Sequence, residues 1–173
     1  FSNFNGTSSY AEMTDDIVLS GDFEVRINLL GIDLSGNAGI LADLPSFGEN
    51  YRLRANFGSV RFDMQNNADT GQTSVIINAV LNPMITLTRA GNIVTMTDGV
   101  TSSFVDITAA GLLNNQITFG LMGRRSSAYL EGQLSNLQIW EGGDSTTGTK
   151  IMNMAMDERY LNVHGEILYN NSA

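Results

Sequence analysis

The sequence contains no cysteine, one histidine and two prolines among its 173 residues. Without cysteine, the chain has no disulfides, no thiolate nucleophile and no thiolate metal site. The single His164 cannot supply a two-histidine zinc site, and a Ser-His-Asp triad would have to use that one side chain. Thiol chemistry and the usual zinc-protease motif are therefore excluded.

Positive charge is also scarce, with nine Lys and Arg against 18 Asp and Glu, a formal net charge of −9 and a pI near 4.3. Nucleic acid is not an expected partner, because phosphate binding needs a basic surface. Lys150 is the only lysine, so arginine supplies the other basic side chains. The planar guanidinium suits carboxylate or phosphate groups, although sheet packing explains surface arginine equally well.

No apolar run is long enough to span a membrane, and no basic region followed by an apolar region marks a signal peptide. We therefore expect no membrane insertion. The sequence starts at Phe1 rather than at a methionine. This start suggests a processed product, a domain excerpt or the ordered part of a longer chain.

Apolar and polar residues alternate with a period of two in many short stretches, which indicates strands that bury one face. The segment 51–57 is one example, with Tyr51, Leu53, Ala55 and Phe57 on one face and Arg52 and Arg54 on the other. Residues 86–101 form two β-prone runs separated by an Ala-Gly-Asn turn, followed by Asp-Gly. The clearest stretches are 23–29, 51–57, 60–62, 85–97, 117–121 and 130–140.

Other segments give weaker signals. Residues 106–115 predict at most one short helical turn, because Gly111 interrupts them. Met152, Met154 and Met156 alternate with small or polar residues and predict a strand with a flexible thioether face. Residues 160–173 predict a final strand pair or a docking tail.

The chain has no internal repeat, no low-complexity segment and no proline-rich linker. We therefore expect one domain over residues 1–173, with 144–173 as a C-terminal strand or docking segment. About a dozen short strands with regular turns predict an all-β fold, a two-sheet antiparallel sandwich with jelly-roll connections.

Three segments resemble laminin G-like domains of the concanavalin A-like lectin/glucanase superfamily. They are the opening 4–28 with its Asn-Gly-x-x-x-Tyr and Phe-x-Val-x-Ile patterns, the hairpin 85–96 with Thr-Arg-x-Gly-Asn-x-Val, and the closing strand 131–140 that ends in Ile-Trp. The resemblance covers Phe4 to about Trp140 and implies a concanavalin A-like sandwich. Residues 140–150 and 156–158 resemble the tail after such domains in bacteriophage virion proteins.

Binding residues are predicted mainly among the arginines. Arg52, Arg54 and Arg61 lie on the polar sides of neighbouring runs, so a hairpin would cluster their guanidinium groups. Such a cluster could bind a carboxylated or sulfated glycan, whereas pairing with Glu24, Asp63 or Glu131 is the structural alternative. Aromatic platforms for a sugar ring are Tyr51, Tyr129 and Trp140; Tyr129, beside Arg124 and Arg125, is the preferred candidate for a rim site.

Calcium is common among the relatives that the resemblance implies, where acidic side chains and loop carbonyls supply oxygen ligands. Asp15, Asp16 and Asp98 are the predicted ligands, in positions that we expect to be loops. Turn formation explains such residues equally well. The cofactor expectation is therefore Ca²⁺ or none.

Glycoside hydrolases of the superfamily carry Glu-x-Asp-x-x-Glu or Glu-x-Asp-x-Glu on one strand, and this chain has neither string. Its nearest approach, Asp157-Glu158 with Glu166, lacks the spacing. A general acid and base from separate strands, such as Glu24 and Glu131, stays open. We predict no catalytic residues and no enzyme.

The expected function is a non-catalytic, lectin-like recognition or adhesion module, extracellular or on a virion surface, that binds a glycan or host-surface receptor. The alternative is a structural virion component, a capsid decoration or tail protein, that contacts other virion proteins or its own copies. In that case Met152, Met154, Met156 and the segment 161–169 would carry the contacts. A glycan-cleaving enzyme is the third hypothesis.

Overall fold

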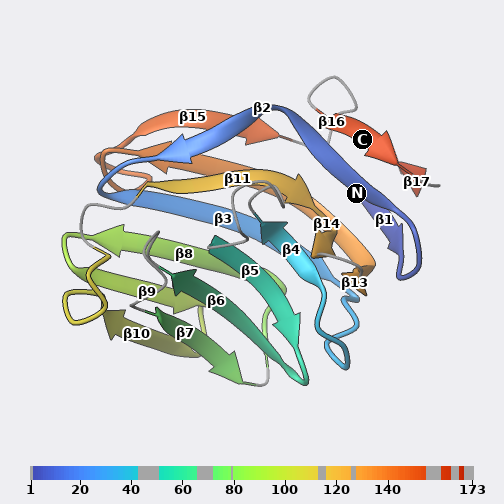
Figure 1. Ribbon diagram of the computed structural model, residues 1–173, viewed down its shortest axis with the longest axis horizontal. Coiled ribbons are helices and arrows are strands. Elements are labelled where there is room, and N and C mark those ends of the chain that lie inside the picture. Colours follow the sequence, from blue (N-terminus) through green and yellow to red (C-terminus); the bar gives the residue numbers. More distant parts are fainter. Residues whose placement is uncertain are drawn as a thin grey trace.

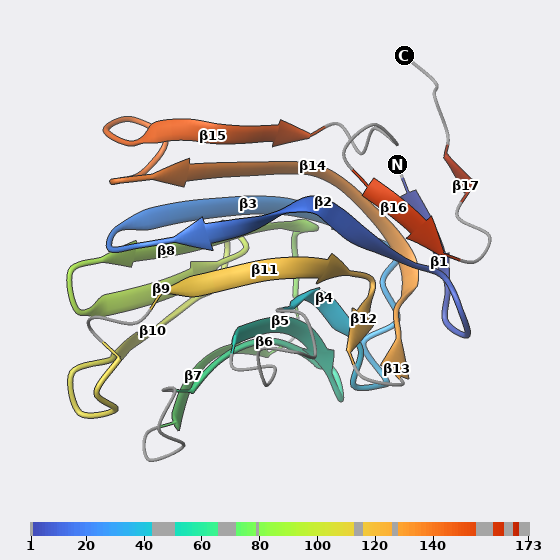
Figure 2. The ribbon, with the colours of Figure 1, turned by 45° about the horizontal axis from the view of Figure 1, so that its top comes forward.

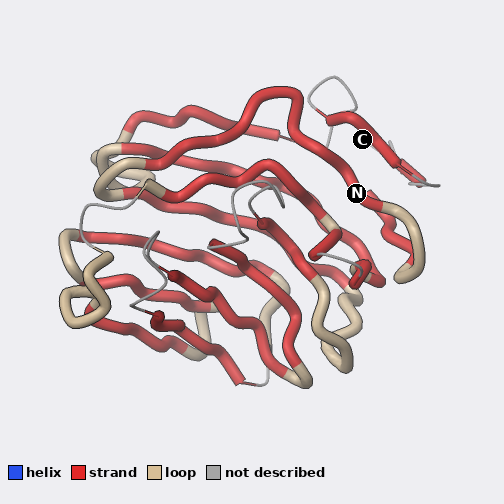
Figure 3. Tube along the Cα trace, in the orientation of Figure 1, coloured by secondary structure: helices blue, strands red, loops and turns tan. Residues whose placement is uncertain are grey.

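In the computed structural model, the described residues are 2–42, 51–65, 72–78, 80–112, 116–125, 128–154, 161–164 and 168–169. This part of the chain consists of strands and turns, without any helix (Figure 3). None of the described segments is therefore a helix of the length and apolarity needed to cross a membrane.

The strand bounds follow the alternation in the sequence. The strands are β1 (Ser2–Asn5), β2 (Tyr10–Leu19), β3 (Phe23–Leu30), β4 (Gly39–Ala42), β5 (Tyr51–Asn56), β6 (Ser59–Gln65), β7 (Gln72–Asn78), β8 (Met84–Ala90), β9 (Ile93–Thr97), β10 (Ser102–Asp106), β11 (Ile117–Met122), β12 (Arg124–Arg125), β13 (Ala128–Tyr129), β14 (Glu131–Glu141), β15 (Thr149–Met154), β16 (Leu161–His164) and β17 (Leu168–Tyr169).

The strands form two large antiparallel sheets that pack face to face (Figures 1 and 2). Sheet A has eight strands in the order β10-β9-β8-β3-β14-β1-β17, and β15 also pairs with β14. Sheet B has seven strands in the order β16-β2-β11-β4-β5-β6-β7, and β12 and β13 form a small separate pair. The predicted all-β, two-sheet antiparallel sandwich is confirmed.

The core lies between the two sheets and is built from alternate residues of each strand. In β3, Phe23, Val25 and Ile27 are buried, and they face buried residues of sheet B such as Leu53 and Phe62. Burial of apolar area contributes about 25 cal/mol per Å², so this two-sided core is the main source of stability. The hairpin predicted within residues 86–101 is confirmed as β8 and β9, with Ala90 opposite Ile93.

The local expectations had different outcomes. Residues 108–111 form one hydrogen-bonded turn, with Gly111 N donating to Thr108 O at 3.1 Å, in agreement with the prediction of at most one short turn. Phe57 is 74% exposed, because β5 ends at Asn56 and Phe57-Gly58 form a two-residue turn. The strand predicted at Met152 is present as β15, but Met152 is partly buried against the core and does not present an outward thioether face. Met156 and residues 155–160 lie outside the described residues, as does the side chain of Met154.

The C-terminal segment contributes strands to both sheets. β15 extends sheet A beside β14, β16 pairs with β2 at the edge of sheet B, and β17 pairs with β1 in sheet A. Figure 2 shows β16 and β17 beside β1, at one end of the sandwich. The described part of this segment therefore lies against the same sandwich.

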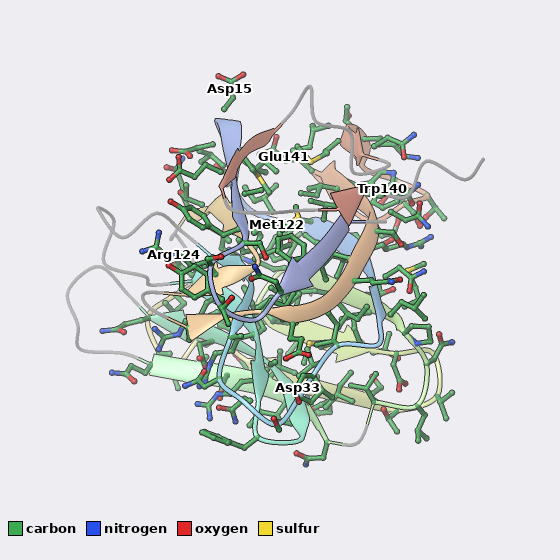
Figure 4. The ribbon with its side chains drawn as sticks, turned by 90° about the vertical axis from the view of Figure 1, so that its right-hand side faces the viewer. Asp15, Asp33, Met122, Arg124, Trp140 and Glu141 are labelled. Carbon is green, nitrogen blue, oxygen red and sulfur yellow. The ribbon has the colours of Figure 1, made fainter. Side chains whose placement is uncertain are left out.

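Several connections lie at one end of the sandwich, toward the right and the lower centre of Figure 1, and we call them the loop rim. We define it as residues 31–38, 57–58, 80–83 and 98–101 with the β12–β13 hairpin. Backbone hydrogen bonds hold its parts in place: Gly58 N donates to Leu34 O at 2.7 Å, and Leu29 N of β3 donates to Pro83 O at 2.7 Å. Figure 4 views the molecule from this end.

Candidate functional site

The three predicted arginines of β5 and β6 lie together on the outer face of sheet B. The hairpin register places Arg52 opposite Asp63, and Arg54 opposite Arg61. Asp63 is in turn opposite Ser74 on β7. Since Leu53 and Phe62 point into the core, their neighbours Arg52, Arg61 and Asp63 point away from it.

Asp63 is the centre of this arginine cluster. Arg54 Nε donates to Asp63 Oδ2 at 2.6 Å, and Arg52 Nε donates to the same oxygen at 3.1 Å. Arg61 Nε donates to Asp63 Oδ1. One carboxylate thus orients three guanidinium groups, and the pairing with Asp63 that was the structural alternative is present.

Arg54 is the most firmly held of the three, and only 7% of it is exposed. Besides Asp63, its Nη1 donates to Asn37 Oδ1 at 2.5 Å and to Asn56 Oδ1. Asn37 belongs to the loop before β4, so this bond ties the cluster to the loop rim. The sequence predicts Arg54 on the solvent-exposed face of its strand, and its ion pair with Asp63 explains why the side chain is buried there.

The charge of Asp63 depends on its partners. Burial raises the pKa of Asp63, but hydrogen bonds from Arg54, Arg52 and Arg61 outweigh burial and hold that pKa below its usual value. Asp63 therefore stays ionised at neutral pH. Three cations against this one anion leave the cluster with a formal charge of +2, in a chain whose net charge is −9.

A polar pocket of about 300 Å³ opens over the arginine cluster. Uncharged hydrogen-bonding side chains from β6 and β7 complete its lining. These side chains are Gln65, Gln72, Thr73 and Ser74. Figure 2 shows the marked curvature of β5, β6 and β7, the strands that form it. A concave site with oriented cations and neutral polar groups can hold a hydroxyl-rich anion.

Asp63 and the neutral lining residues were not predicted as binding residues. The signal for Asp63 was present, because a two-residue turn at Phe57-Gly58 places it directly opposite Arg52. The contribution of β7 could not be predicted in this way, since the connection between β6 and β7 gives no register from the sequence.

The predicted rim residues Arg124 and Tyr129 also lie together, directly opposite each other in the β12–β13 hairpin. The Arg124 guanidinium lies 5.6 Å from the Tyr129 ring centre and 4.6 Å from that of Tyr10. The two rings are 6.1 Å apart. Tyr10, which the sequence did not single out, is thus part of this group, and Figure 4 shows Arg124 at the loop rim. The side chain of Arg125 lies outside the described part of the chain.

The other two aromatic candidates are buried. Tyr51 is 4% exposed and belongs to the core. Trp140 lies opposite Glu24 on the outer face of sheet A, where Arg26 and Lys150 stack over its ring at 5.1 and 4.8 Å. At 5% exposure, Trp140 offers no platform for a sugar ring.

The predicted calcium ligands do not fit a cation site. Asp15 and Asp16 lie within β2, not in a loop, where the pairing register with β11 is interrupted between Glu12 and Ile17. Figure 4 shows Asp15 apart from the loop rim, at the upper edge of the molecule. Within the described residues, no three acidic or histidine side chains form a group suited to a metal ion.

The Asp98 carboxylate accepts hydrogen bonds from backbone groups of the loop rim. Its Oδ2 accepts from Leu81 N at 2.7 Å, and its Oδ1 accepts from the backbone N–H groups of Val100 and Thr101 at 2.9 and 2.6 Å. Burial would raise the pKa of Asp98, but these backbone donors hold it far below its usual value. Asp98 therefore joins two loops as a buried carboxylate, a role that needs no cation.

Glu24 and Glu131 cannot act as a catalytic pair. Glu24 lies opposite Trp140 near one end of β14, whereas Glu131 begins that strand nine residues away. At about 3.4 Å per residue, this separation is roughly 30 Å, against at most about 9.5 Å in glycosidases. Asp157, Glu158 and Glu166 lie outside the described residues.

The fold can be compared with solved structures. One that superposes is "Mouse laminin alpha1 chain, domains LG4-5", with a TM-score of 0.61 and 14% sequence identity over 94% of this chain. The chain has a laminin G-like fold. It spans 45% of the length of that laminin chain. No protein-family model and no curated protein matches the sequence, and at this identity the likeness concerns the fold alone.

Proposed function

We propose that this laminin G-like domain is a non-catalytic recognition module that binds an acidic carbohydrate in the pocket over the arginine cluster. The observation that carries the proposal is the convergence of Arg52, Arg54 and Arg61 on Asp63 at the floor of a polar 300 Å³ pocket. Guanidinium groups bind carboxylates and sulfates through paired charge-assisted hydrogen bonds.

Each arginine has a distinct part in the proposed site. Arg54, which Asn37 and Asn56 also hold, fixes the position of the Asp63 carboxylate. The side chains of Arg52 and Arg61 are 21% and 33% exposed and present the accessible positive charge. The amides and hydroxyls of Gln65, Gln72 and Ser74 would bond the neutral hydroxyl groups of the sugar.

A calorimetric titration with tri-galacturonate, and with maltotriose as the neutral comparison, tests the proposal. We expect the acidic sugar to bind and the neutral sugar to bind at least tenfold more weakly, with affinity falling as salt rises. Arg61→Gln should weaken binding of tri-galacturonate about tenfold or more, the loss of one charge-assisted contact.

Lys150→Gln is the matched control, because it removes one exposed positive charge on sheet A, away from the pocket. Equal weakening by Lys150→Gln and Arg61→Gln would show that net charge alone attracts the sugar. A sulfated oligosaccharide is titrated in the same way. The proposed function is contradicted if neither this sugar nor tri-galacturonate shows saturable binding.

The place where such a module acts is a further part of the proposal. Display on a virion or on a bacterial surface rests on the resemblance of residues 140–150 and 156–158 to phage virion tails. Calcium dependence stays a prediction without a fitted set of ligands, and a titration with and without a chelator tests it. The role of a structural virion component loses one of its predicted contact residues, because Met152 faces the core.

A further inference from the structure

The loop rim borders a second pocket, of about 300 Å³, whose lining shares no residue with the pocket over the arginine cluster. It opens between the two sheets, since Leu29 comes from β3 of sheet A and Val60 from β6 of sheet B. The remaining apolar lining comes from the loops and the end of β3. These residues include Leu30, Ile32, Leu34 and Leu81.

Two exposed apolar side chains line this pocket, and two more belong to loops that are hydrogen-bonded to its lining segments. Leu30 and Leu81 line it and are 43% and 66% exposed. Val100, 66% exposed, lies two residues after Asp98, whose carboxylate accepts hydrogen bonds from both Val100 N and Leu81 N. Phe57, 74% exposed, lies in the turn that is hydrogen-bonded to Leu34 and Gly36. Exposed apolar side chains that line a concavity, as Leu30 and Leu81 do, mark a binding surface more often than isolated ones do.

The lining carries no ionised side chain. The charged residues of the adjoining loops are Asp33, which bonds Ser35 N and Oγ at 2.8 Å, and Asp98, which is buried under its backbone donors. An anionic ligand would meet no cation here, and transfer of any charge into an apolar pocket is costly. The chemistry of the pocket therefore favours a neutral occupant.

The rim is also held in place before any ligand binds. The Asp98 carboxylate fixes residues 81–82 against residues 98–101, and Leu29 N to Pro83 O anchors the same loop to β3. The turn at Phe57 is anchored by Phe57 N to Gly36 O at 3.0 Å. A preformed pocket avoids the ordering cost of binding.

We propose that this rim pocket binds a neutral, compact apolar molecule, about the size of two fused rings. A cavity of about 150 Å³ with a similar lining holds benzene, and this pocket has twice that volume. Its size lies at the lower bound of ligand sites, which are mostly apolar. The site is separate from the arginine cluster and does not depend on the carbohydrate proposal.

The test is a titration of 2-naphthylmethanol into the intact chain, followed by its fluorescence and by the methyl NMR signals of Leu34 and Val60. We expect saturable binding that shifts these signals, and at least tenfold weaker binding of the anionic 2-naphthalenesulfonate. Leu30→Glu should weaken the binding of 2-naphthylmethanol at least tenfold. Ile151→Glu is the matched control, because Ile151 is a 45% exposed aliphatic residue on β15, and it should leave the binding unchanged.

Three results would overturn the proposal. The first is the absence of saturable methyl shifts, and the second is an equal effect of Leu30→Glu and Ile151→Glu on binding. The third is a concentration-dependent association of the chain that Leu30→Glu abolishes and that added 2-naphthylmethanol does not reduce. The last result would make the rim an interface between copies of the chain. Arg61→Gln should leave naphthylmethanol binding intact, so failure of the carbohydrate proposal and failure of this one are distinguishable.

Discussion

Arg54 Nε donates a hydrogen bond to Asp63 Oδ2 at 2.6 Å, and each side chain of this pair is about nine-tenths buried. The Asp63 carboxylate has two roles in this arrangement. A buried guanidinium needs a counter-charge, and the same carboxylate orients Arg52 and Arg61 at the mouth of the pocket. Asp63 therefore links the stability of sheet B to the shape of its proposed binding site.

Asp63→Asn should lower the free energy of unfolding by about 2 kcal/mol, because it leaves Arg54 buried without its counter-charge. Urea unfolding at pH 7 measures the change. Asp33→Asn is a suitable control, since Asp33 is exposed and its carboxylate accepts hydrogen bonds only from Ser35 among the contacts described, and we expect little change there. Equal stability of the Asp63 variant and the native chain would show that the pair contributes nothing.

Acid should destabilise the fold through Asp63 and Asp98. Their hydrogen-bond donors hold both pKa values below the unfolded value, although burial acts in the opposite direction. A carboxyl group of this kind stabilises the fold fully above its unfolded pKa of about 3.9, and that contribution is lost as the pH falls toward the folded pKa. The free energy of unfolding should thus be nearly constant from about pH 7 to 5 and decline below about pH 4.

Asp98→Asn separates the contribution of the loop rim. The amide loses acceptor sites for Leu81, Val100 and Thr101, so the variant should be less stable than the native chain at pH 7 by about 2 kcal/mol. Because the variant cannot be protonated there, the two unfolding curves should converge as the pH falls. Parallel curves between pH 5 and 2.5 would contradict this account of Asp98.

Phe57 occupies a backbone conformation that a bulky residue rarely adopts, with φ at 44° beside Gly58 at 90°. Asn-Gly is the preferred pair in such a turn, so Phe57→Asn should raise the free energy of unfolding by about 1 kcal/mol. Phe104→Asn is the matched control: it removes an equally exposed phenylalanine from the middle of β10, where asparagine is unfavourable. Thermal unfolding of both variants should show opposite shifts.

The alternation of residues in the sequence predicted the sandwich because packing one face of each strand imposes a period of two. It failed where a contact depends on another part of the chain. The alternation predicts that Glu24 is exposed to solvent, yet it is only 4% exposed. Arg26 forms an ion pair with it at 2.5 Å, and Ser145 N approaches its Oε2. The alternation also predicts that Phe57 is a core residue, but the turn ends β5 at Asn56, one position earlier.

The candidate sites divide in the same way. The arginine cluster was predictable, since Arg52, Arg54 and Arg61 lie on two consecutive strands joined by a short turn. The rim pocket was not, because its walls come from loops that are far apart in the sequence, such as those containing Leu34 and Leu81. Those loops are brought together by sheet topology and by the Asp98 carboxylate, neither of which has a local sequence signal.

Gly132 of β14 lies beside the loop after β3, and it combines a φ of 129° with a close approach to the backbone of that loop. An added Cβ would lie 2.7 Å from Ile32 Cα and 2.8 Å from Gly31 O, both main-chain atoms that cannot rotate away. Gly132→Ala should therefore lower the free energy of unfolding by about 3 kcal/mol, as backbone strain and overpacking add.

Gly142→Ala isolates the strain from the clash, since Gly142 has a φ of 76° and no atom within 4 Å of an added Cβ. We expect that variant to lose only about 1 kcal/mol. Urea unfolding of both variants gives the difference, which measures how tightly residues 31–32 press on β14. If the two variants lose equal stability, residues 31–32 yield to the new methyl group. The wall of the rim pocket that Gly31 and Ile32 form would then be deformable, rather than preformed as the binding proposal requires.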